Sequence, residues 1–71
     1  MTAKKEVLTE REREFARNYC IGYSAKESGQ VLGVTEETVK TSIRQIKIFW
    51  SGGGMSRREF YVRAQREGIV P

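Results

Sequence analysis

Residues 32–50 read LGVTEETVKTSIRQIKIFW and predict a turn followed by a helix. Gly33 is a typical helix end, and Thr35 is a typical helix start because its hydroxyl can cap a free backbone amide. Two glutamates follow Thr35 in the first turn, where carboxylates favour the positive end of the helix. Apolar residues then recur at the spacing of one helix face, at Val39, Ile43, Ile46 and Trp50. We therefore expect a helix over about residues 36–50.

Three capping boxes predict three further helices. In this motif a hydroxyl side chain caps the amide of a residue three positions on, and a glutamate at that position bonds back. The motif occurs at residues 9–12, 24–27 and 56–59. The glycines that follow predict helices over about residues 10–21, 25–32 and 57–67. The expected fold class is all-α: a tri-helical helix-turn-helix with a fourth, C-terminal helix, and not a winged helix.

A length of 71 residues allows one small domain. Residues 1–7 are polar at their start and are interpreted as a flexible N-terminal leader. Residues 8–71 are expected to form a single helix-turn-helix domain, with a Gly-rich linker at 51–55 before the last helix. A chain of this length has no room for a separate sensory domain, so we expect no small-molecule ligand.

The composition excludes several classes of function. The chain has no histidine and one cysteine, so Ser-His and Cys-His nucleophile pairs, an intrachain disulfide and a Cys/His zinc site are excluded. No apolar run approaches the ~20 residues of a membrane span, and no phosphate-binding glycine motif is present. We expect no catalytic residue, cofactor, metal ion or membrane partner.

Positive charge is concentrated in the second half of the chain. Residues 38–71 carry seven basic and two acidic side chains, a net +5, whereas residues 1–37 carry −1, which together give the total of +4. No acidic residue lies between Glu37 and Glu59. A charged helix face that only meets solvent normally mixes signs, so this distribution favours an anionic partner.

The basic residues share one face of the helix over 36–50. Lys40, Arg44 and Lys47 are spaced i, i+4, i+7, beside the apolar face. Only residues 33–35 separate this helix from the one before it, which is the form of a helix-turn-helix. A basic stripe on its second helix is typical of a protein that reads the major groove of double-stranded DNA.

These motifs together resemble the LuxR/GerE-type helix-turn-helix family of bacterial transcription regulators. LTERERE at residues 8–14 resembles the family's start LTxREREV, and GYSAKE at 22–27 resembles GxSNKEIA. LGVTEETVK at 32–40 resembles LGVSExTVK, and the likeness extends over about residues 8–70.

The resemblance implies roles for individual residues. Base edges would be contacted by Lys40, Thr41 and Arg44. Thr38 and Lys47 would contact phosphates. Family members pair through the last helix, which implies a homodimer with Tyr61, Val62 and Gln65 in its interface. Near the start of the second helix, further candidate phosphate contacts are Tyr23, Ser24 and Lys26, because helix N-termini favour anions.

Two features depart from the family pattern. Ser28 stands where the family has a large aliphatic residue, which predicts a looser second helix or room for a bulky neighbour such as Trp50. Gly29 follows and costs helix propensity, about 1 kcal/mol against Ala. The linker is longer than usual by about two residues and richer in glycine.

Other functions remain open at this point. A DNA-packaging protein like a phage terminase small subunit also begins with a helix before a helix-turn-helix. An interaction adapter or antirepressor on the same fold would use aromatic anchors, at Trp50, Phe60 and Tyr61. For a regulator we expect a location in the bacterial cytoplasm at the nucleoid, and control by abundance or by a protein partner such as RNA polymerase or an antirepressor. A chromosomal and a phage or mobile-element origin both remain open.

Overall fold

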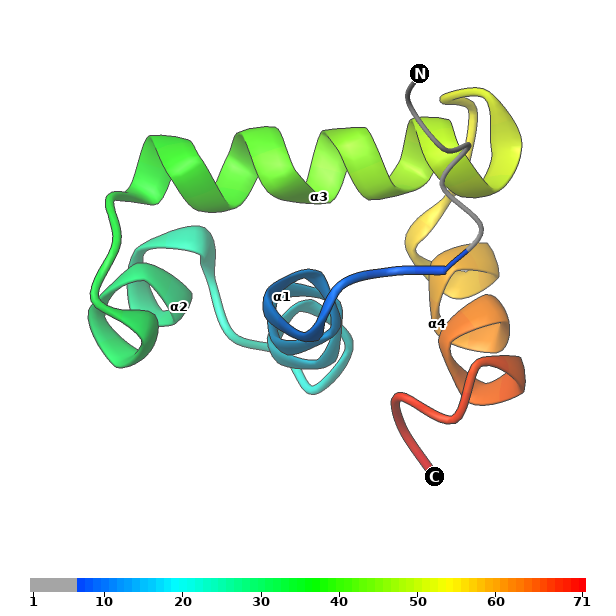
Figure 1. Cartoon of the computed structure of the whole chain (residues 1–71), viewed down its shortest axis with the longest axis horizontal. Coiled ribbons are helices and arrows are strands. Elements are labelled where there is room, and N and C mark those ends of the chain that lie inside the picture. Colours follow the sequence, from blue (N-terminus) through cyan, green and yellow to red (C-terminus); the bar gives the residue numbers. More distant parts are fainter. Residues whose placement is uncertain (1–6) are drawn as a thin grey trace, which may run out of the picture.

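Four helices make up the part of the chain that the computed structural model describes, residues 7–71 (Figure 1). They are α1 (Glu10–Cys20), α2 (Ala25–Leu32), α3 (Glu36–Ser51) and α4 (Arg57–Arg66), and no strand occurs in this part. The expected all-α class is confirmed. The leader expected at residues 1–7 lies outside the described residues except for Val7, which is exposed.

The predicted caps account for where each helix begins. The hydroxyls of Thr9, Ser24 and Ser56 each accept a hydrogen bond from the amide three residues on, at 3.1–3.2 Å. The glutamate at that position accepts the cap residue's own amide in all three boxes. Thr35 caps α3 by accepting from the amide of Thr38 at 3.1 Å. All four helix starts are therefore as the sequence predicts.

The turn between α2 and α3 is short because Gly33 adopts a left-handed conformation, with φ 73°. Few residues other than glycine take this conformation at little cost. The amide of Val34 then donates to the carbonyl of Gly29 at 2.9 Å, and the half-buried Val34 packs against the core. The chain reverses within three residues, and α2 and α3 form a helix-turn-helix.

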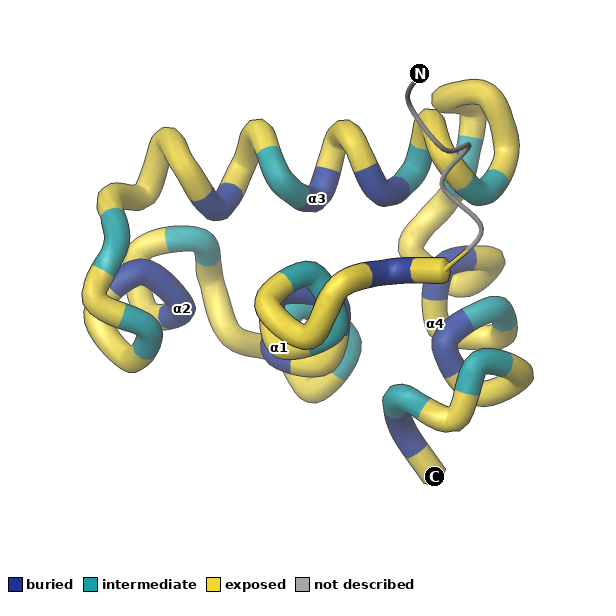
Figure 2. The backbone as a smooth tube through the Cα atoms, viewed as in Figure 1, coloured by how far each residue is buried: buried dark blue, intermediate teal, exposed yellow. Residues whose placement is uncertain are grey.

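Helix α3 extends along one side of the molecule, with α1 and α2 against its inner face and α4 near its C-terminal end (Figure 1). It contacts α2 and α1, and α1 in turn contacts α4. The buried residues of α3 are Val39, Ile43 and Ile46, all on the side that faces α1 and α2 (Figure 2). The opposite side of α3 is exposed along its length, so a long polar face is open to a partner.

The fourth helix is held by an aromatic cluster. Phe60 is fully buried, and its ring centroid lies 4.7 Å from that of Tyr19 and 4.9 Å from that of Trp50. Trp50 is therefore not the bulky neighbour that was one of the two possibilities beside Ser28. Trp50 lies near the end of α3 and packs on α4, whereas Ser28 lies beside a groove at the start of α3.

Candidate nucleic-acid interface

The outward face of α3 presents the three residues predicted to contact bases. Lys40, Thr41 and Arg44 are all exposed. The Nζ atom of Lys40 lies 3.2 Å from a carboxylate oxygen of Glu36, one turn earlier. This ion pair is solvent-exposed, so it adds little stability and leaves the ammonium available.

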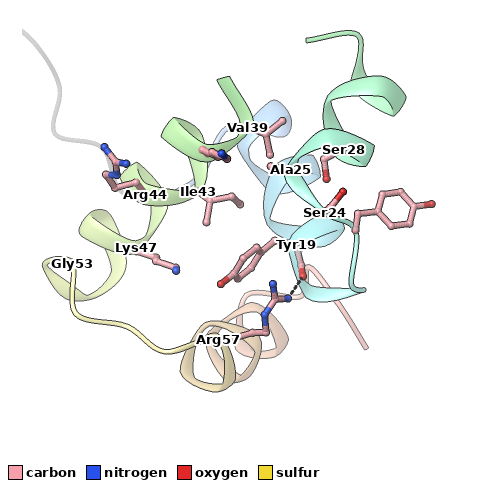
Figure 3. A pocket seen from close by; sticks show the side chains of 12 residues that line it. Tyr19, Ser24, Ala25, Ser28, Val39, Ile43, Arg44, Lys47, Gly53 and Arg57 are labelled. Atoms are coloured by element: carbon pink, nitrogen blue, oxygen red, sulfur yellow. Dashed lines mark hydrogen bonds between the residues drawn. The ribbon is translucent and has the colours of Figure 1, made fainter. Parts of the chain in front are cut away.

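A groove of about 410 Å³ runs beside this face, between α3 and the start of α2. Its floor is mostly apolar and includes Ala25, Ser28, Val39 and Ile43. Four cationic side chains line the groove, and they are Lys40, Arg44, Lys47 and Arg57. Figure 3 labels the last three. The groove therefore offers a cationic edge on two helices, α3 and α4, over a floor from α2 and α3.

Five of the predicted contact residues meet in this groove. They are Tyr23, Ser24, Lys40, Arg44 and Lys47. Lys26 and Thr41 are exposed but do not line it, and neither does Thr38, whose hydroxyl lies 2.8 Å from that of Thr35. The structure thus groups the start of α2 with the basic face of α3.

Lys47 differs from the other basic residues of α3 because it is half-buried and points toward α1. Its Nζ atom lies 5.1 Å from the centroid of the Tyr19 ring. The guanidinium carbon of Arg57 lies 4.2 Å from the same centroid, and Arg57 Nη1 donates to the Tyr19 carbonyl at 2.9 Å (Figure 3). One ring therefore holds two cations, one from α3 and one from α4.

Sequence reasoning missed the contact between Tyr19 and Arg57. Tyr19 fits the inward face of α1, and Arg57 is one of several arginines in the last helix. Their contact spans 38 residues of sequence, and the spacing within a helix carries no signal for it.

The basic side chains of the groove have few acidic neighbours. In residues 7–71 the ion pairs are Arg11–Glu14, Lys40–Glu36 and Arg63–Glu67. Within this part of the chain, Arg44, Lys47 and Arg57 therefore have no carboxylate at ion-pair distance. Uncompensated cations along a groove create a positive potential that attracts polyanions.

Two further side chains near the groove, Glu27 and Cys20, have a shifted pKa, and both have structural roles. The capping bonds from the amide and hydroxyl of Ser24 lower the pKa of Glu27, because they stabilise its charged form. Burial raises the pKa of the Cys20 thiol, and the nearby charge of Arg57 acts in the opposite direction. A thiol with a raised pKa is a poor nucleophile. No group of three or more metal-ligating side chains occurs in residues 7–71.

The residues predicted for dimer contacts lie on the outer side of α4. Tyr61 and Val62 are exposed, at 37% and 43%. Gln65 is also exposed, and its side-chain amide donates to the carbonyl of Pro71 at 3.0 Å. The aromatic anchors expected for an adapter are not grouped on the surface, because Phe60 is fully buried and Trp50 is half-buried.

None of the helices in the described residues has the length and apolar character needed to cross a bilayer. No curated protein and no solved structure matches the chain. A family model does match: bacterial regulatory proteins, luxR family (GerE), over residues 6–48. This match includes α1, α2 and most of α3, with the turn between them. The chain therefore belongs to the luxR family of bacterial regulatory proteins, a family of DNA-binding regulators with a helix-turn-helix domain.

Proposed function

We propose that this protein is a sequence-specific transcription regulator that binds double-stranded DNA as a homodimer and reads the major groove with α3. The observation that carries the proposal is the exposed face of α3, which presents Lys40, Thr41 and Arg44 beside a groove. Three cations of this groove, Arg44, Lys47 and Arg57, have no carboxylate at ion-pair distance within residues 7–71. An α-helix fits the width of the major groove, and base edges there differ for every base pair.

Base contacts are assigned by chemistry and position. Arg44 is exposed and has no carboxylate partner in residues 7–71, so its guanidinium is free to form two hydrogen bonds to a guanine. Lys40 and Thr41 lie one turn earlier on the same face and can donate to base acceptors. These three residues supply the sequence preference in the proposal.

Phosphate contacts come from the residues around the start of α2 and from α3. Tyr23 and Ser24 line the groove next to the first amides of α2, where an anion is favoured by the helix dipole. Lys47, on α3, can contact the phosphates of the same DNA strand. Lys26 and Thr38 are exposed on either side of the turn between α2 and α3. These contacts set position on the duplex and are independent of its sequence.

In the proposed homodimer, two copies of the chain pair through α4. Exposed Tyr61 and Val62, with Gln65 one turn on, would meet their copies across a two-fold axis. Two α3 helices would then reach half-sites about one helical turn apart, ~34 Å. A protein of this kind acts at the bacterial nucleoid, and RNA polymerase or an antirepressor is the protein partner that fits the role.

The direct test selects preferred duplexes from a random pool with the whole protein. It then measures affinity by fluorescence anisotropy for a selected and an unrelated duplex. Arg44→Ala and Lys40→Ala should each weaken binding to the selected duplex by roughly 1–3 kcal/mol and reduce the preference at one position of the site. Arg13→Ala on α1, which lies outside the groove, is the matched control and should bind as the unmodified protein does.

Two results would contradict the proposal. If both α3 variants bind the selected duplex as tightly as Arg13→Ala, α3 does not read the bases. If the pool yields no preferred sequence and the protein forms rings in solution, the DNA-packaging function fits better. A selected site with two-fold symmetry, bound by two copies of the chain, supports the homodimer.

A further inference from the structure

We propose that Tyr19, Lys47 and Arg57 form a single phosphate-binding site, so that α4 takes part in DNA binding through its first residue. The proposal rests on the DNA binding proposed above and adds a contact to it. The two cations come from different helices and both lie near the Tyr19 ring, at 5.1 Å and 4.2 Å from its centroid, on different sides of the ring in Figure 3.

The charges around Tyr19 favour an anion within reach of both cations. Like charges that share a ring repel each other, and within residues 7–71 neither Lys47 nor Arg57 has a carboxylate at ion-pair distance. The ring offsets part of this repulsion through its negative face. A phosphate group carries the missing negative charge and accepts hydrogen bonds from both side chains.

Tyr19 and Arg57 are held in place before any ligand arrives. The Tyr19 ring packs edge-on against the buried Phe60, at 4.7 Å between centroids. The guanidinium of Arg57 is fixed on the ring by the hydrogen bond from its Nη1 atom to the Tyr19 carbonyl. Arg57 therefore loses little rotamer freedom on binding, and it keeps other N–H donors for an anion.

The position of the site selects a DNA phosphate as its ligand. Lys47, Tyr19 and Arg57 line the same groove as Ser24, at the start of α2, and Arg44, on the reading face of α3 (Figure 3). In Figure 3 the Tyr19 hydroxyl points into the groove, and it has no hydrogen-bond partner in residues 7–71. A backbone strand that passes the start of α2 would bring a phosphate to this end of the groove.

The test combines salt dependence with removal of single phosphate charges. Affinity is measured for the selected and the unrelated duplex between about 50 and 200 mM KCl. Arg57→Gln keeps a donor for the Tyr19 carbonyl and removes the charge, and Arg17→Gln removes one charge from α1 outside the groove. Arg57→Gln and Lys47→Gln should weaken both duplexes about tenfold and lower the salt slope by up to ~0.9, the value for one phosphate. Arg17→Gln should leave the slope unchanged.

Neutral methylphosphonates, introduced one at a time, identify the phosphate itself. One substitution should weaken the unmodified protein about tenfold and add nothing further to the loss in Arg57→Gln or Lys47→Gln. It should still weaken Arg17→Gln by the same factor. Such a non-additive loss, which we call coupling, shows that Arg57 contacts that phosphate, because a purely structural role of Arg57 would add its loss to that of the methylphosphonate. If Arg57→Gln fails to fold, Lys47→Gln and Tyr19→Phe, which removes only the hydroxyl, serve in the same scan.

The outcomes separate this inference from the proposed function. If Arg44→Ala loses its site preference while Arg57→Gln and Lys47→Gln match Arg17→Gln, α3 reads DNA but the three-residue site does not exist. The same conclusion follows if no methylphosphonate shows the coupling. If the unmodified protein binds neither duplex, the proposed function and this site are both wrong.

Discussion

Gly29 lies directly against the carbonyl oxygen of Val34, so closely that a Cβ atom on Gly29 would stand 2.6 Å from that oxygen. The same two residues are joined by the hydrogen bond from the Val34 amide to the Gly29 carbonyl, at 2.9 Å. The tight turn between α2 and α3 thus depends on the absence of a side chain at position 29. The turn sets how α3 is presented beside α2.

Gly29→Ala should therefore destabilise the domain although alanine is the better helix former. The gain in propensity is about 1 kcal/mol, and the forced backbone shift should cost more, for a net loss of roughly 1–2 kcal/mol. Urea denaturation followed by circular dichroism measures the change. Gly54→Ala is the matched control, because a Cβ there meets nothing within 4 Å and its φ is not positive. A more stable Gly29→Ala protein would contradict the close approach.

Glu36→Gln should strengthen DNA binding. The carboxylate of Glu36 holds Lys40 at 3.2 Å and places a negative charge at the start of the proposed reading helix. Its removal takes away a negative charge that repels phosphates, so we expect a gain of about two- to fivefold at low salt. Glu14→Gln breaks the comparable Arg11–Glu14 pair on α1 and should leave affinity unchanged. Equal affinities for the two variants would show that Glu36 lies away from the DNA.

The free energy of unfolding should decrease in acid, because protonation weakens two of the capping boxes. Hydrogen bonds from Ser24 and Ser56 lower the pKa of Glu27 and Glu59 below the ordinary value of 4.5. A lowered pKa in the folded state means that the contribution is fully present above pH 4.5 and is lost as the pH falls through the folded-state pKa. Urea denaturation at pH 7 and at pH 3 measures the free energy of unfolding. Between these two pH values it should fall less in the double variant E27Q/E59Q than in Glu37→Gln, because Glu37 lies outside the capping boxes. An identical pH profile in both would mean that the caps do not form in solution.

The fourth helix should depend on Phe60. Its ring is fully buried between Tyr19 and Trp50, and removal of a buried phenyl ring costs roughly 3–5 kcal/mol. This is a large part of the total stability of a small domain, so Phe60→Ala should lose cooperative unfolding or have a much lower melting temperature. Fluorescence of Trp50, the single tryptophan, reports the change directly. Arg58→Ala, two residues away and exposed, is the control and should melt close to the unmodified protein.

The helices could be predicted from the sequence because their signals are local. Capping boxes and glycine stops act within four residues, and the inward spacing of Val39, Ile43 and Ile46 shows which face of α3 is buried. The groove could be predicted only in part. Its α2 and α3 residues follow from the helix-turn-helix, but the contact of Arg57 with Tyr19 depends on how α4 packs after a glycine linker. No local pattern sets that placement. The contact of Trp50 with Phe60 could not be predicted for the same reason, since Phe60 lies beyond the linker.

The proposed dimer should separate when a charge is placed in the exposed apolar patch of α4. Tyr61 and Val62 are both more than a third exposed, and a dimer would bury them against their copies. Val62→Glu should therefore shift sedimentation from dimer to monomer, because a buried unpaired carboxylate is costly. Binding to a two-fold symmetric duplex should weaken more than tenfold, whereas binding to a single half-site should stay within about twofold, since the reading face is untouched. Val31→Glu introduces the same charge at an exposed residue of α2 and should remain a dimer. If the unmodified protein is a monomer that binds single half-sites, one copy of the chain recognises DNA on its own and α4 has no role in pairing.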